Sequence, residues 1–201
     1  MNFLFKLSSY LFHPIWMPFV GAVFYFLVTP RFFPYPVIKA KLIAIAIMTL
    51  FIPIVFYFML NTIGKAGSYF LEDVKERRLP LLFYIALNGI ILKFVLDAFD
   101  FPALYYYFFG ILISSVIGLL FVMFRKKISL HLMGLAGITM FIVALSFHFR
   151  LNLIYTIGFL VAIMGLTASA RLHYKAHSYS ELVLGFFIGL IPQIAVLFFW
   201  L

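Results

Sequence analysis

Three polar residues near the C-terminus, Arg171, His177 and Glu181, have the types and spacing that chemistry requires. His177 follows Arg171 by six residues, and Glu181 follows His177 by four. On a helix, a spacing of four places the imidazole and the carboxylate one turn apart on the same face. A carboxylate in that position can fix the tautomer of the histidine and stabilise its protonated form. Charge of this kind in a very apolar chain predicts a functional site.

Two glycines, Gly185 and Gly189, continue the spacing of four from His177 and Glu181. The pattern predicts one helical ridge over these four residues, with the glycines allowing a neighbouring helix to approach closely. Two further glycines, at positions 134 and 137, lie on another apolar stretch. Together with Gly185 they either leave a lateral gap for a lipid or serve tight helix packing, and the sequence does not choose between these readings.

The composition is that of an integral membrane protein. Of the 201 residues, 66% are hydrophobic and only 10% are charged, whereas a soluble domain carries about 25% charged residues. The absence of cysteine excludes disulfides, thiol catalysis and cysteine-ligated metals. The net charge of +9 suits anionic lipid headgroups or phosphate substrates. Nucleic acid is not an expected partner, because the basic residues lie in short loops between apolar stretches.

The apolar stretches predict an all-α bundle of about seven membrane spans in a single domain, residues 1–201. We expect residues 1–12 to lie along the membrane interface and Pro53 to kink the second span. The spans are expected at about 14–28, 37–60, 81–96, 103–124, 129–147, 153–168 and from the 169–189 segment to 201. With this parity, the polar segments 72–80, 128–131 and 169–189 share one membrane face.

Two other segments carry basic, hydroxyl and imidazole side chains that could act together with Arg171, His177 and Glu181. One reads Lys75-Glu-Arg-Arg78-Leu-Pro80, and the other reads Ile128-Ser129-Leu-His131. With Arg171-x5-His177-x3-Glu181, these segments resemble the three motifs of the type-2 phosphatidic acid phosphatase superfamily. The family motifs are K-x6-R-P, P-S-G-H and S-R-x5-H-x3-D, the last often continued by V-x2-G-x3-G. The resemblance covers residues 72–189 and implies a six-helix phosphatase core, to which this chain adds one span.

The chain departs from the family pattern in each motif. The family lysine is absent, since Phe70 and Leu71 stand seven residues before the two arginines, and Lys75 is the candidate substitute. The second motif lacks its proline and glycine. In the third, Ser169 is displaced by one residue, and Glu181 replaces aspartate, which lengthens the reach of the carboxylate by one methylene.

The resemblance implies a metal-independent phosphatase without cofactors that works through a phosphohistidine. It makes His177 the nucleophile, Glu181 its orienting carboxylate, and His131 the general acid and then the base. It assigns phosphate binding to the following residues: Arg77, Arg78, Arg171, Ser129 and Lys75. The implied substrate is a lipid phosphate or diphosphate, such as an isoprenoid (di)phosphate, phosphatidate, phosphatidylglycerol phosphate or a lipid A phosphate. The expected location is a bacterial inner membrane.

Three alternatives compete with this interpretation. His173, His177 and Glu181 have the spacing of a zinc-binding ridge. A catalytically inactive bundle that binds a lipid phosphate or a partner protein has the same composition. A transporter is the third, although no pair of broken helices in matching halves supports it. Retained hydrolysis separates the enzyme from the binder, and insensitivity to chelators separates it from the metalloenzyme.

Overall fold

The computed structural model describes residues 2–64 and 74–201, and every regular element in these ranges is helical. Seven helical segments are long and apolar enough to cross a membrane, which confirms the prediction of an all-α integral membrane protein with seven spans. In chain order the elements are α1 (Asn2–Leu11), η1 (Pro14–Trp16), α2 (Met17–Val28), α3 (Tyr35–Ala46), η2 (Ile47–Phe51), α4 (Ile52–Thr62), η3 (Lys75–Arg77), α5 (Arg78–Ile90), η4 (Ile91–Val95), α6 (Pro102–Met123), α7 (Leu130–His148), α8 (Ile154–His173), α9 (Tyr179–Val196) and η5 (Leu197–Phe199).

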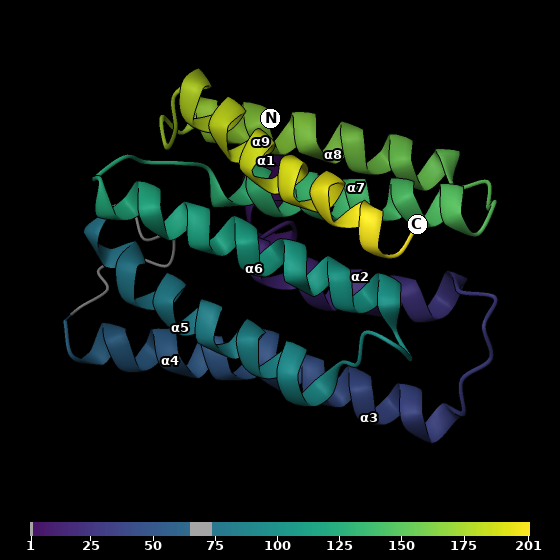
Figure 1. Cartoon of the computed structure of the whole chain (residues 1–201). Helices are drawn as coiled ribbons and strands as arrows, with labels where there is room; N and C mark the ends of the chain where they lie inside the picture. The colour runs from purple at the N-terminus through teal and green to yellow at the C-terminus, as the bar shows by residue number, and fades with distance from the viewer. Residues whose placement is uncertain (1, 65–73) are drawn as a thin grey trace.

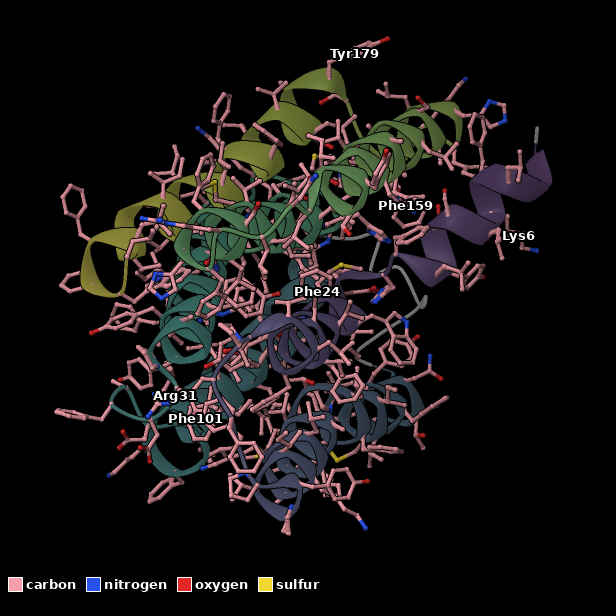
Figure 2. All side chains as sticks on the ribbon, turned by 90° about the vertical axis from the view of Figure 1, so that its right-hand side faces the viewer. Lys6, Phe24, Arg31, Phe101, Phe159 and Tyr179 are labelled. Carbon is pink, nitrogen blue, oxygen red and sulfur yellow. The ribbon has the colours of Figure 1, made fainter. Side chains whose placement is uncertain are left out.

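Helices α2 to α9 run roughly along one direction in two groups (Figure 1), and α1 lies across that direction (Figure 2). The group formed by α3, α4 and α5 lies on one side of α6 and α2, and α7, α8 and α9 lie on the other. Helix α7 is at the centre of the second group and buries Leu135, Ile138, Phe141 and Leu145. The ring of Phe141 stacks on Tyr107 of α6 with 4.1 Å between centroids, so a bulky aromatic layer joins the two helices.

Helix α1, for which a position along the membrane interface is expected, is a separate helix that precedes α2. Helix α1 packs along α8, with Phe12 against Phe159 at 6.5 Å and Phe5 against His173 at 5.2 Å between ring centroids. Together α1, η1 and α2 form one apolar segment, Leu4–Val28, of spanning length. The break between α1 and α2 falls at Pro14, which begins η1 behind the N-cap residue His13.

A five-residue π-turn, η2, precedes Pro53 at the predicted kink. Proline has no N–H to donate, and the preceding Ile52 N–H bonds back to the Ile47 carbonyl instead. The third span begins earlier than expected, at Lys75, because Pro80 falls in the first turn of α5, where its missing N–H costs nothing.

Three helices end in the same way, with a basic residue in the left-handed region. Arg125, Arg150 and Lys175 have φ values of 57°, 52° and 53°. At each, the N–H of the basic residue and the N–H of the residue after it bond back into the last turn, as in the Schellman motif that glycine usually completes. These cations also lie at the negative end of the helix dipole.

The loops 124–129 and 174–178 and the start of α5 lie at one end of the bundle, on the left of Figure 1. The opposite end has its own polar contacts. There Arg31 lies beside Phe101 (Figure 2), and its Nη1–H donates to the Asp100 carbonyl at 3.0 Å. This contact closes the loop between η4 and α6 against the loop between α2 and α3.

Candidate functional site

The loop between α8 and α9 is fixed at both ends. The carbonyl of Arg171 accepts hydrogen bonds from the N–H groups of Ala176 (3.0 Å) and His177 (3.3 Å). Ser178 then caps α9: its hydroxyl accepts from Glu181 N–H, and the Glu181 carboxylate accepts from Ser178 N–H at 3.3 Å. This reciprocal pair is a capping box. The sequence S178-Y-S-E181 carries the signature of this motif.

His177 therefore lies just before α9 and not on it, which corrects the expected continuous ridge from His177 to Gly189. The contact expected from that ridge still forms, because the capping glutamate turns back toward the loop. His177 Nδ1 lies 2.7 Å from Glu181 Oε2, and the two side chains are 2% and 25% exposed. Since the carboxylate accepts from Nδ1–H, the lone pair of the neutral imidazole is on Nε2.

The two glycines of α9 pack against the start of α7, as predicted. A Cβ added to Gly185 would lie 2.4 Å from the Ser129 carbonyl oxygen, and one added to Gly189 would lie 2.0 Å from that of Met133. Real Cβ atoms do not approach so closely, so only glycine permits this helix contact. For Gly185 this decides between the two readings in favour of tight packing.

Two hydrogen bonds to backbone carbonyls join the three motif segments. Arg77 is 3% exposed, and its Nη1–H donates to the Ile128 carbonyl at 2.9 Å. The next residue, Ser129, donates its N–H to the Glu181 carbonyl at 3.1 Å. The first segment is thus held to the second, and the second to the third.

His131 enters the site from the first turn of α7. Its side chain is 6% exposed, and its Nε2 lies 3.2 Å from the Ser9 carbonyl of α1. Because a carbonyl can only accept, Nε2 carries a proton in this arrangement. The N-terminal helix, to which the sequence analysis gave no role, therefore holds one of the predicted site residues.

A cavity of about 560 Å³ brings four of the predicted residues together. Its lining includes Arg77, His131, Arg171 and His177 at the polar end, and it continues between α4, α5, α6 and α7 along apolar side chains. His13 also lines it, with its ring edge-on to His131 at 5.2 Å between centroids. The arrangement is a basic end on an apolar body, which suits an amphipathic anion.

The remaining predicted residues lie elsewhere. Lys75 and Arg78 are exposed and do not line the cavity. Ser129 is fully buried and its hydroxyl caps α7 by accepting from Leu132 N–H at 3.4 Å. The positions of Glu72 and Asp73, and of Phe70 and Leu71 where the family lysine is missing, lie outside the described residues.

Burial lowers the pKa of His177 to about 4, from an ordinary value of 6.5. The hydrogen bond that His177 donates to Glu181 opposes this shift in pKa, while the positive charges of Arg77 and Arg171 add to it. Because the folded-state pKa is depressed, His177 is neutral at physiological pH and takes up a proton only in acid. A neutral imidazole with its Nε2 lone pair available has the form that a nucleophile requires.

The zinc-binding alternative loses its third ligand in this geometry. His173 ends α8 and contacts Phe5 and Tyr174, with ring centroids 5.2 Å apart in both pairs. Across residues 2–64 and 74–201, no three histidine, aspartate or glutamate side chains are grouped so that they could hold a metal ion.

Residues that sequence reasoning missed come mainly from the N-terminal segment. His13 and Ser9 had no motif around them, and only tertiary packing brings them to α7. At the far end of the cavity, Tyr107 and Gln193 read as ordinary residues of apolar spans.

Comparisons of this chain with protein-family models, curated proteins and solved structures found no match.

Proposed function

We propose that this protein is a metal-independent phosphatase that hydrolyses a lipid phosphate or diphosphate through a phosphohistidine on His177. The observation that carries the proposal is the basic end of the cavity, where Arg77 and Arg171 accompany a histidine paired with a carboxylate. Phosphoryl transfer requires mainly positioning and charge neutralisation, which these groups supply. We place the protein in a bacterial inner membrane, in keeping with the family that its motifs resemble.

In the first half-reaction, the Nε2 lone pair of His177 attacks phosphorus and the bond from phosphorus to the leaving oxygen breaks. Glu181 accepts from Nδ1–H throughout and stabilises the positive charge that the ring acquires. Arg77 and Arg171 hold the phosphoryl oxygens, for which guanidinium groups provide paired donors.

His131 serves as the acid in this step. The bound phosphoryl dianion favours its protonated form, in which one N–H stays on the Ser9 carbonyl and the other gives its proton to the leaving oxygen. In the second half-reaction, water attacks phosphorus, its proton passes to His131, and the bond between phosphorus and Nε2 breaks to release phosphate.

A protein that binds lipid phosphates without hydrolysing them is the second candidate. The hydrogen bond between His131 and Ser9 favours it, because that bond occupies one ring nitrogen of the assigned acid. Lys75 and Arg78 are exposed and do not line the cavity. Their positions therefore do not distinguish a phosphatase from a protein that only binds lipid phosphates.

The experiment is release of inorganic phosphate by purified protein from a panel of lipid phosphates in nanodiscs, with and without a chelator. Hydrolysis that survives the chelator and is lost in His177→Asn is the expected result. Binding of the panel without hydrolysis supports the second candidate, and hydrolysis that His177→Asn retains removes His177 as nucleophile.

A further inference from the structure

The polar side chains at the inner end of the cavity donate their hydrogen bonds to backbone carbonyls of the protein. The Tyr107 hydroxyl donates to the Met17 carbonyl at 2.9 Å, and the Gln193 amide donates to the Tyr107 carbonyl at 3.0 Å. Ser114 and Ser115 each donate to a carbonyl one turn earlier in their own helix. With these bonds made inside the protein, the surface that remains suits hydrocarbon.

The depth of the cavity follows from the contact between α7 and α9. Ser129 meets Gly185 near the basic end, and Gly137 meets Gln193 at the inner end. At 1.5 Å per residue, about 12 Å of α7 separates the two levels. One leaflet of the hydrocarbon core is about 15 Å deep, so the cavity extends through most of a leaflet.

The cavity also has a rim of large exposed side chains. Tyr10 and Trp16 come from the N-terminal segment, and Ile54 and Phe58 come from α4. All four line the cavity and are at least 36% exposed. All four belong to segments long and apolar enough to cross a membrane, and exposed apolar side chains on such segments suit contact with lipid. The rim lies away from Gly185, where a lateral gap was one of the two expectations.

We infer that the cavity binds one hydrocarbon chain of the lipid phosphate, which enters from the bilayer between the N-terminal segment and α4. This inference rests on the proposed function and narrows its substrate class to single-chain phosphates, of isoprenoid or monoacyl type. The volume of about 560 Å³ is in the range that holds one ligand of moderate size. A second pocket lies at the opposite end of the bundle, around Arg31 and Lys41, too far from His177 to take a second chain of the same lipid.

The test uses a single-chain alkyl phosphonate with a diazirine at the end of its chain, photolysed with the full-length protein in nanodiscs. Labelling is expected on cavity residues of 107–115, 134–138 or 193. A monoacyl phosphate should compete at least tenfold more strongly than diacyl phosphatidate. Labelling confined to lipid-facing residues such as Val116 and Phe187, or equal competition by both lipids, would overturn the inference.

A matched pair of variants tests the inner end directly. A Cβ on Gly137 is in ordinary contact with α9 near Gln193, so Gly137→Leu fills the cavity there, whereas a Cβ on Gly165 of α8 meets nothing within 4 Å. Gly137→Leu should reduce labelling at least fivefold, with Gly165→Leu unchanged. Equal labelling in the Gly137→Leu and Gly165→Leu variants contradicts the inference. If Gly137→Leu does not fold, Gly137→Ala is tested with a longer probe instead. Phosphate release is measured in parallel so that the two proposals can fail separately. Labelling without hydrolysis would refute the proposed phosphatase activity but would still support a hydrocarbon-binding cavity.

A second inference comes from a different observation, the hydrogen bond of His13. As N-cap of η1, its Nδ1 accepts from Ile15 N–H at 3.3 Å, so the ring proton is on Nε2. The ring lines the basic end of the cavity beside His131. We propose that His13 Nε2–H donates to the phosphoryl group and replaces the lysine that the first motif lacks, a role that exposed Lys75 outside the cavity does not fill.

His13→Asn isolates this donor. Asparagine is a favourable N-cap residue, so the start of η1 is kept while the reach of the ring is lost. His173→Asn, outside the cavity, is the control. The His13 variant should bind the phosphonate probe about tenfold more weakly, with partial recovery in His13→Gln, whose longer amide carries an N–H near the position of Nε2. Unchanged probe affinity in His13→Asn would overturn this assignment whether or not the protein hydrolyses lipids.

Discussion

Replacing Glu181 with glutamine separates the charge of this side chain from its role in the fold. Glutamine also serves at the third position of a capping box, so the hydrogen bond to Ser178 N–H is kept. What is lost is the negative charge 2.7 Å from His177 Nδ1. Both side chains are largely buried, at 2% and 25% exposure, so solvent replaces little of that interaction.

The size of the effect follows from this geometry. A hydrogen bond to a charged group is worth about 1.5–3 kcal/mol against about 1 kcal/mol for a neutral one. The difference, about 0.5–2 kcal/mol, lowers kcat by roughly 2- to 30-fold at 1.36 kcal/mol per tenfold. If the amide N–H₂ turns toward His177, the tautomer reverses and Nε2 loses its lone pair. The corresponding exchange in a Ser-His-Asp triad costs about 10⁴.

We therefore expect a loss in kcat between about 2-fold and 10⁴-fold for Glu181→Gln, with a thermal midpoint within a few degrees of the parent. Glu181→Asp is the companion variant. It keeps the charge but moves it by about one methylene, and a displacement of ~1 Å can cost 10²-fold. The assay is phosphate release from a single-chain lipid phosphate. A glutamine variant with parental kcat would refute the role given to the carboxylate.

Three further predictions concern separate parts of the site. Arg77→Lys should lower kcat/KM roughly 10- to 100-fold, because one ammonium cannot make the paired contacts of a buried guanidinium, whereas Arg78→Lys at the exposed neighbouring position should stay within twofold. Lys175→Gly should raise the thermal midpoint in detergent without changing kcat, since it removes a left-handed strain of about 1 kcal/mol at φ 53°; a lowered midpoint contradicts this. In NMR spectra of histidine-labelled protein, His177 should stay neutral from pH 8 to about pH 5 and take up its proton near pH 4, and a midpoint near 6.5 would show that the site is wetter than the structure indicates.

The fold was predictable because membrane spans appear in the sequence as long apolar stretches. Seven segments of spanning length are present among the described residues, and the second is interrupted by a π-helical segment just before Pro53. The errors lie at helix ends, where apolar composition does not mark the boundary. Helix α8 continues past Ala168 to His173. The third span begins with a helical turn, Lys75–Arg77, whose polar sequence predicts a loop; Pro80 is compatible with this because proline is tolerated in the first turn of a helix.

The site was predictable only where its residues are close in sequence. The contact between His177 and Glu181 follows from their spacing, although the helix begins at Tyr179, two residues later than that spacing suggests. The choice of Arg77 over Arg78 depends on how η3 turns toward Ile128, which a pair of adjacent arginines does not reveal. The approach of His13 to His131 arises from packing between segments more than a hundred residues apart, and no local pattern encodes it.

The central claim, a phosphohistidine at His177, is tested most directly by trapping that intermediate. Purified protein is mixed with a lipid phosphate labelled in its phosphoryl group, quenched in alkali within the first turnover and mapped by peptide mass spectrometry. The account predicts an acid-labile phosphoryl group on His177 that forms before phosphate is released, is absent from His177→Asn, and accumulates when the second half-reaction is slowed. Turnover without any labelled histidine, or a label on another residue that persists in His177→Asn, would contradict it.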